Sequence, residues 1–242
     1  ATRVAKEAQG IAVAFGLPLA VSGVVYNVAA LAANGRIVGF VGKQNLAGDG
    51  IHYEPRWFKP WPRGAVASVN VDGRAVPVGD LVFSINGIRI GFEICEDAWV
   101  ANRPGAELAE RGVDIILNPS ASHFAFGKHG VRQRFVLEGS RAFSVGYVYS
   151  NLVGNESGRA IYDGGALIAQ AGRMLAAGPR FSYADSAVTC ATLDIDEIRM
   201  GRARTGSFRP LIGDPNDNVV RSPFQFQKSS YVVERPDRKS VV

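Results

Sequence analysis

The spacing of hydrophobic positions along the chain switches repeatedly between that of helices and that of strands. Near the start, Val4, Ala8, Ile11 and Phe15 recur at helical spacing, and Gly16 can end that helix. Three further helices are predicted, over residues 105–111, 128–143 and 196–204. Strands are predicted where apolar residues run together or alternate, over residues 19–25, 27–33, 36–41, 81–85, 88–94, 113–117, 146–152, 165–170 and 187–194.

Two pairs of these strands are predicted to form hairpins, because each pair is joined by an Asn-Gly turn. The turns are Asn34-Gly35 and Asn86-Gly87, and both residue types tolerate the positive φ angles of a tight hairpin. Strands that alternate with helices, together with hairpins, predict an α/β fold in which helices pack outside a mixed sheet. From about residue 206 the periodicity vanishes, so residues 206–242 are predicted to form an extended tail or linker.

The composition is that of an ordinary globular chain, since 47% of the 242 residues are hydrophobic and 20% are charged. No apolar run reaches the roughly 18 residues of a membrane span, so no membrane partner is expected. The 27 basic and 22 acidic side chains are dispersed, which argues against a nucleic-acid partner. Two distant cysteines and three histidines do not have metal-ligand spacing. We therefore expect no metal or cofactor in this domain, and a reducing cytoplasm as its location.

Cys95 is the first candidate for chemistry, because it lies where a predicted buried strand ends and Glu96-Asp97 begins a turn or helix. Backbone N–H groups at such a position favour the thiolate, which is the nucleophilic form of cysteine. The local sequence is equally compatible with a small apolar residue that closes a strand. Cys190 has no charged neighbour in its predicted strand and is expected to lie in the core.

Two further groups follow predicted strands. Lys43 can place its ammonium near a thiolate and later stabilise an oxyanion, although a lone lysine is more often a solvated surface charge. Residues 118–122, Asn-Pro-Ser-Ala-Ser, follow another buried strand. Small polar residues at the carboxyl end of a strand commonly wall a ligand crevice, but they also make plain turns.

These elements together give the chain a resemblance to the nitrilase, or carbon–nitrogen hydrolase, superfamily. Within that superfamily it most resembles the glutaminase domain of glutamine-dependent NAD synthetases, over roughly residues 1–200. The segments that carry the resemblance are Ile94-Cys-Glu-Asp-Ala-Trp99, Asn118-Pro-Ser-Ala-Ser-His-Phe-Ala-Phe-Gly-Lys128 with Arg132, Tyr149-Ser-Asn-Leu-Val-Gly-Asn155 and Tyr162-Asp-Gly-Gly165.

The resemblance implies a four-layer α-β-β-α sandwich with a Glu-Lys-Cys triad. Cys95 matches the catalytic nucleophile and Lys43 matches the lysine. Glu54, eleven residues after that lysine, matches a second glutamate that holds the lysine and the substrate.

The resemblance also implies the reaction and its substrate. Ser122 and Trp99 fall where side chains contact glutamine, and the N–H of Glu96 joins the lysine in stabilising the oxyanion. Glutamine would be hydrolysed to glutamate and ammonia through a cysteine thioester. The ammonia would then serve the ATP-dependent amidation of deamido-NAD to NAD. Relatives commonly pair through their outer helices, so a homo-oligomer is expected.

Two features of the family pattern are missing from the sequence. The family's general base is a glutamate on an early strand, and the one acid near the start, Glu7, is expected to be a solvated helix residue. We therefore expect a sandwich without its first strand or strands, and an inactive fragment. Residues 1–205 correspond to the hydrolase domain. Residues 206–242 would lead toward an absent synthetase domain, the part for which ATP and magnesium are expected.

Two other hypotheses remain open at this point. The chain could be a stand-alone amidase or nitrilase that acts on another small amide or nitrile, in which case glutamine would not be preferred. It could also be a non-catalytic module retained for assembly, which the missing glutamate favours.

Overall fold

The computed structural model of the chain describes residues 1–156, 158–213 and 218–226. Its first sheet has five strands in the order β1-β2-β3-β5-β4. Neighbouring strands of this sheet are antiparallel except β3 and β5, which run parallel. The five strands are β1 (Ala12–Val21), β2 (Val24–Ala33), β3 (Arg36–Gly42), β4 (Val66–Val71) and β5 (Arg74–Gly79).

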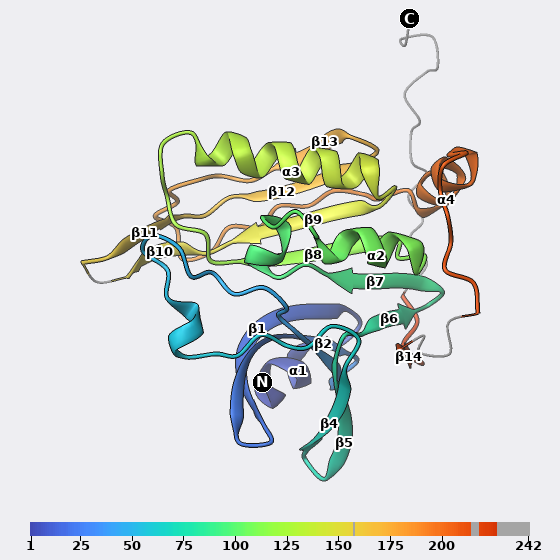
Figure 1. Ribbon diagram of the computed structural model, residues 1–242, viewed down its shortest axis with the longest axis horizontal. Coiled ribbons are helices and arrows are strands. Elements are labelled where there is room, and N and C mark those ends of the chain that lie inside the picture. Colours follow the sequence, from blue (N-terminus) through green and yellow to red (C-terminus); the bar gives the residue numbers. More distant parts are fainter. Residues whose placement is uncertain (157, 214–217, 227–242) are drawn as a thin grey trace, which may run out of the picture.

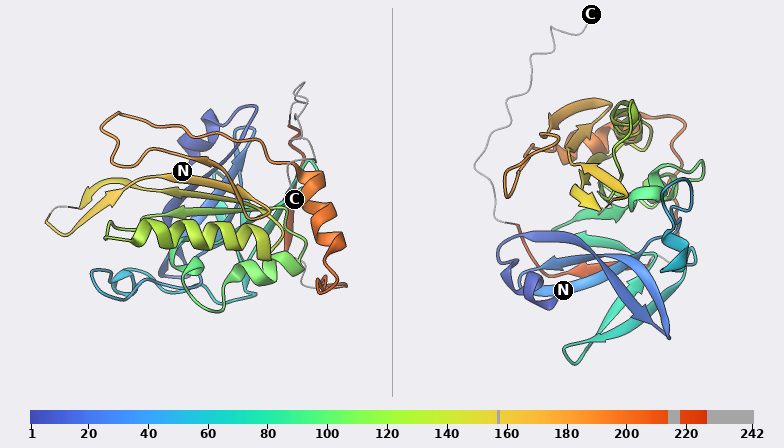
Figure 2. Two further views of the ribbon diagram at one scale, coloured as in Figure 1. Left: turned by 90° about the horizontal axis from the view of Figure 1, so that it is seen from above. Right: turned by 90° about the vertical axis from the view of Figure 1, so that its left-hand side faces the viewer.

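The second sheet has seven strands in the order β13-β12-β9-β8-β7-β6-β14. Its central strands β7, β8 and β9 run parallel, so their carboxyl ends meet at one edge of the sheet. A separate hairpin, β10 (Val153–Glu156) with β11 (Ala160–Asp163), projects from one end of the molecule (Figures 1 and 2). The seven strands are β6 (Val82–Ile85), β7 (Ile88–Phe92), β8 (Ile115–Ser120), β9 (Gly146–Asn151), β12 (Ala166–Gln170), β13 (Arg173–Ala177) and β14 (Val219–Ser222).

The helices lie mostly against the seven-stranded sheet. Figure 1 shows α2 and α3 along this sheet and α4 at the end opposite the β10–β11 hairpin. In the described part of the chain, no helix is long and apolar enough to span a bilayer. The helices are α1 (Thr2–Glu7), α2 (Pro104–Glu110), α3 (Lys128–Ala142), α4 (Ile195–Arg204) and the short 3-10 helices η1 (Glu54–Arg56) and η2 (Cys95–Ala98).

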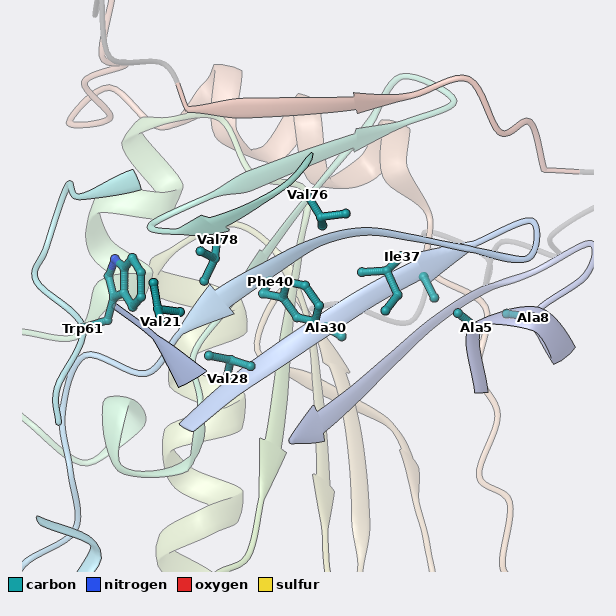
Figure 3. Close-up of a cluster of buried hydrophobic side chains, with 11 residues drawn as sticks. Ala5, Ala8, Val21, Val28, Ala30, Ile37, Phe40, Trp61, Val76 and Val78 are labelled. Atoms are coloured by element: carbon teal, nitrogen blue, oxygen red, sulfur yellow. The ribbon is translucent and has the colours of Figure 1, made fainter. Parts of the chain in front are cut away.

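Three buried clusters define the layers. Leu31 of the five-stranded sheet packs with Phe83 and Phe92 of the seven-stranded sheet, so the two sheets lie face to face. A second cluster joins α2 and α3 to the other face of the seven-stranded sheet. The third covers the outer face of the five-stranded sheet, where Ala5 and Ala8 at the N-terminus reach Ile37 and its neighbours (Figure 3). The predicted α/β fold class is confirmed.

The predicted helix at the N-terminus is shorter than expected. It ends at Glu7, Gly10 adopts a left-handed φ of 70°, and residues 12–21 form a strand paired along its whole length with β2. The spacing of Ile11 and Phe15 suits a strand as well as a helix, and the pairing with β2 decides between them. Both Asn-Gly turns lie where predicted, with φ of 47° at Asn34 and 51° at Asn86.

A third hairpin obeys the same rule but was not predicted. Alternating residues on either side of Asp72-Gly73 form β4 and β5, and Asp72 has a φ of 49°. Strand β14 was also not predicted. It lies within the segment expected to be an extended tail, yet it pairs in parallel with β6, and Phe224 packs between the sheets. Part of that segment therefore belongs to the folded core.

The predicted strand over residues 187–194 is wrong, because these residues form no strand and most are exposed. Cys190, expected in the core, is likewise exposed, as is Val188 at 83%. The segment is rich in alanine and threonine, whose small side chains bury too little apolar surface to hold it in the sheet.

Candidate active site

Cys95 begins the turn that follows β7. Its φ of 50° is left-handed, a conformation that costs an L-residue with a side chain roughly 1–2 kcal/mol. The backbone N–H of Cys95 donates to Oδ1 of Asn118, 3.3 Å away on the neighbouring strand β8. The side chain is half-buried. Strained backbone of this kind persists where the surroundings fix it, and it commonly marks a functional site.

Lys43 follows β3 directly and is only 2% exposed. Its Nζ lies 2.5 Å from Oε2 of Glu54, which is in η1. The same carboxylate accepts hydrogen bonds from Asn27 Nδ2 at 2.7 Å and from the N–H of Ala47 at 2.8 Å. A buried ammonium needs such a partner, and the Glu54 carboxylate fixes the lysine at the carboxyl end of β3.

Cys95, Lys43 and Glu54 line one open pocket of about 660 Å³. The structure therefore brings all three predicted catalytic residues together in a single site. The rest of the wall is partly aromatic and partly polar. It includes Asn27, His52, Tyr53, Trp57, Phe58, Ser120, Asn151 and Tyr162.

Asp97 connects the two strand ends that carry these residues. Its Oδ1 accepts from the main-chain N–H and the side-chain amide of Asn45, and its Oδ2 accepts from the N–H of Ile94. Burial raises the pKa of this carboxyl to about 6, against the effect of these hydrogen bonds, which lower it. Local sequence predicts Asp97 only as the acidic start of a turn, because its bond to Asn45 spans 52 positions.

The predicted substrate-binding residues lie near the pocket but are not among the described residues that line it. Ser122 is buried, and its hydroxyl accepts a hydrogen bond from Nη2 of Arg132 at 3.2 Å. The ring of Trp99 packs edge-on against Phe135. The side chain of Glu96 is half-buried, and burial raises its pKa.

A cluster of basic side chains near the pocket was not predicted. His52, a pocket residue, lies 2.8 Å from His123 through ring nitrogens, and Lys128 Nζ lies 3.1 Å from the His123 ring. Burial, and then the charge of Lys128, lowers the pKa of His123 to about 4. The sequence gives no signal for this cluster, because His52 and His123 are 71 positions apart.

Glu7 is exposed on α1, which confirms that it is a solvated helix residue.

A cysteine on a strained strand-end turn shares its pocket with a buried, carboxylate-held lysine, and these features define a class of protein. Residues 3–203 match the carbon-nitrogen hydrolase family, and the chain belongs to this family. Among named relatives it is 32% identical to a putative glutamine-dependent NAD(+) synthetase of Schizosaccharomyces pombe, over 93% of this chain and 33% of that protein. It is 34% identical to the glutamine-dependent NAD(+) synthetase of Homo sapiens, over 79% of this chain and 28% of that protein.

Solved structures give the same result. The glutamine-dependent NAD(+) synthetase of Cytophaga hutchinsonii is 42% identical, with a TM-score of 0.72 over 78% of this chain and 31% of that one. A carbon-nitrogen hydrolase of Helicobacter pylori shares the fold, with 18% identity and a TM-score of 0.65 over 84% of this chain and 68% of that one. The chain spans about a third of the length of the NAD synthetases that it matches.

Proposed function

We propose that this chain hydrolyses the side-chain amide of glutamine to glutamate and ammonia through a thioester on Cys95. The observation that carries the proposal is the shared pocket of Cys95, Lys43 and Glu54, in which the ammonium of Lys43 is held by the Glu54 carboxylate. Glutamine as the substrate is supported by the relatives, which are named glutamine-dependent NAD synthetases.

In the proposed reaction the thiolate sulfur of Cys95 attacks the amide carbon, and the C=O electron pair moves onto oxygen. Lys43 and the N–H of Glu96, in the first turn of η2, stabilise that oxyanion. Collapse of the intermediate breaks the C–N bond, and ammonia leaves after its nitrogen receives the proton that the general base had taken from the thiol. Water then adds to the thioester, the C–S bond breaks, and glutamate and the thiolate are released.

The role of Glu54 follows from its hydrogen bonds. Both of its oxygens accept N–H groups, from Asn27 on one side and from Lys43 and Ala47 on the other. We assign it to holding the lysine. The general base stays assigned to a glutamate that this sequence lacks, so low turnover by the chain alone is part of the proposal.

The ammonia is proposed to serve ATP-dependent amidation of deamido-NAD to NAD in a synthetase domain of the same protein. Residues 1–205 are the proposed glutaminase domain, and ATP and magnesium belong to the other domain. Association of copies through the outer helices and a cytoplasmic location complete the proposal.

The test combines turnover with covalent labelling, because labelling needs the nucleophile but not the complete reaction. Glutamate release from glutamine is measured alongside labelling of Cys95 by a diazoketone analogue of glutamine. Both should disappear in Cys95→Ala and persist in Cys190→Ala, which removes the exposed thiol. Glutamate release that persists in Cys95→Ala, or a wild-type chain that neither releases glutamate nor becomes labelled, would overturn the proposal. Preference for another amide in a substrate panel would instead identify a stand-alone amidase.

A further inference from the structure

A continuous set of polar side chains, all buried except the half-buried Arg103, leads from the start of α2 to the backbone of Cys95. In order, its members are Arg103, Glu93, Tyr147 and Asn118, and they come from four different elements or their ends. None of them is among the described residues that line the pocket. Polar groups so far inside the protein are costly unless each has a partner, so their arrangement calls for an explanation.

We call these four residues the relay, and Glu93 is its most firmly held member. Its side chain is fully buried directly after β7. Arg103 donates to both of its oxygens, at 3.1 and 2.6 Å, and the N–H of Gly105 adds a third bond at 2.8 Å. Two parallel bonds from one guanidinium fix the plane of the carboxylate, so Glu93 presents Oε2 in a set direction.

Tyr147 connects Glu93 to Asn118. Its hydroxyl donates to Oε2 of Glu93 at 2.5 Å and accepts from Nδ2 of Asn118 at 2.9 Å. Burial raises the pKa of Tyr147 well above its ordinary value, so the hydroxyl keeps its proton. With that proton committed to Glu93, the Tyr147 oxygen can act only as an acceptor, and it accepts from Nη2 of Arg103 at 3.1 Å as well as from Asn118. The amide of Asn118 must therefore turn its NH₂ group toward Tyr147.

The other end of the Asn118 amide therefore faces the nucleophile turn. Its Oδ1 accepts from the N–H of Cys95 at 3.3 Å and from Oγ of Ser120 at 2.7 Å. Cys95 is the residue with the left-handed φ of 50°, so this bond acts on the strained point of the turn.

We propose that Asn118 is a positioning residue for Cys95, and that Tyr147, held by Glu93, fixes the orientation of the Asn118 amide. The relay keeps the turn in its left-handed conformation, and so holds Cys95 in the pocket that Lys43 also lines. This inference rests on Cys95 being the nucleophile of the proposed function. It adds residues that act behind the pocket and do not touch the substrate.

The experiment compares the reactivity of Cys95 with that of Cys190, which serves as the internal reference. Iodoacetamide is a small neutral reagent that needs no glutamine recognition. The ratio of alkylation rates at Cys95 and at the exposed Cys190 is measured by peptide mass spectrometry at pH 7. The variants are Asn118→Leu, which has nearly the same shape but no acceptor, Tyr147→Phe, and the two combined. Ser140→Ala is the matched control, because it also removes a fully buried, hydrogen-bonded hydroxyl, on α3.

Displacement of a reacting group by about 1 Å can cost about 10²-fold, so a fall of about 10-fold or more in the ratio is expected for Asn118→Leu. Tyr147→Phe should lower the ratio in the same direction while keeping its ring in the core. The combined variant should be no worse than Asn118→Leu alone, because Tyr147 acts through Asn118. Ser140→Ala should keep the wild-type ratio.

An unchanged ratio in natively folded Asn118→Leu or Tyr147→Phe would overturn the inference. So would fully additive effects in the combined variant, or an equal fall in Ser140→Ala. Failure of the proposed function has a different signature. If the ratios behave as expected while wild-type chain neither releases glutamate nor is labelled by the glutamine analogue, the relay stands and the glutaminase assignment falls.

Discussion

Asp97 accepts hydrogen bonds from both the main-chain N–H and the side-chain amide of Asn45, at 2.8 and 2.9 Å. Asp97 comes two residues after Cys95, and Asn45 comes two residues after Lys43. One buried carboxylate thus joins the strand ends that carry the nucleophile and the lysine, each of which belongs to a different sheet. The distance between the two groups depends on this connection between the sheets.

The protonation state of the Asp97 carboxyl should affect how the free energy of unfolding depends on pH. An unfolded aspartate takes up a proton only below about pH 4, whereas the folded pKa is about 6. Between these values the folded chain binds more protons, so lowering the pH from 7 to 5 should stabilise wild type relative to Asp97→Asn. The effect is on the order of 1 kcal/mol between pH 7 and pH 5, and it reaches on the order of 3 kcal/mol below about pH 4. Urea unfolding of both proteins at several pH values measures it, and parallel pH profiles would contradict it.

Glu54→Gln should damage both stability and activity, because it leaves the 2%-exposed ammonium of Lys43 without its counter-charge. Removal of one partner of a buried pair costs about 3–5 kcal/mol. Misplacement of an oxyanion donor costs on the order of 10²–10³ in turnover. Chemical unfolding and glutamate release measure the two effects. The double variant Lys43→Met/Glu54→Gln should recover stability but not turnover; recovery of turnover would exclude Lys43 from the chemistry.

Lys128→Met should raise the pKa of His123, because the Lys128 ammonium is the largest charge effect that lowers it after burial. Lys128→Arg keeps the charge and should leave the histidine close to its wild-type value. Titration of the imidazole C–H resonances by NMR measures the pKa in each variant. Equal values in Lys128→Met and wild type would mean that the Lys128 charge does not lower the pKa of His123.

Gly42→Ala should destabilise the chain by about 1–3 kcal/mol, the usual cost of overpacking a core. An added Cβ at this buried position would collide with the side chain of Trp61. Because Lys43 is the next residue, turnover should fall as well. Gly201→Ala on α4 is the control, since its Cβ would meet no atom within 4 Å. Replacing a helical glycine there should stabilise by about 0.5–1 kcal/mol. Urea unfolding separates the two outcomes.

Much of the fold could be predicted from local sequence. Residues 128–143 have helical periodicity, and α3 spans Lys128–Ala142. The Asn-Gly turns set the registers of two hairpins, because a two-residue turn leaves little freedom in pairing. The predictions are wrong where secondary structure depends on whether a segment finds a strand to pair with. Residues 12–21 became a strand through β2, whereas residues 187–194 found no place in the sheet.

The sequence by itself determined the candidate chemistry of this protein. Cys95 and Lys43 could be identified because each follows an apolar strand, and Glu54 through the resemblance to carbon–nitrogen hydrolases. Only the tertiary structure decided what holds these groups in place. The hydrogen bonds that Asn45 donates to Asp97, Cys95 to Asn118 and Tyr147 to Glu93 join residues 52, 23 and 54 positions apart. Local periodicity carries no information at such separations, because packing of the strands and sheets creates these contacts.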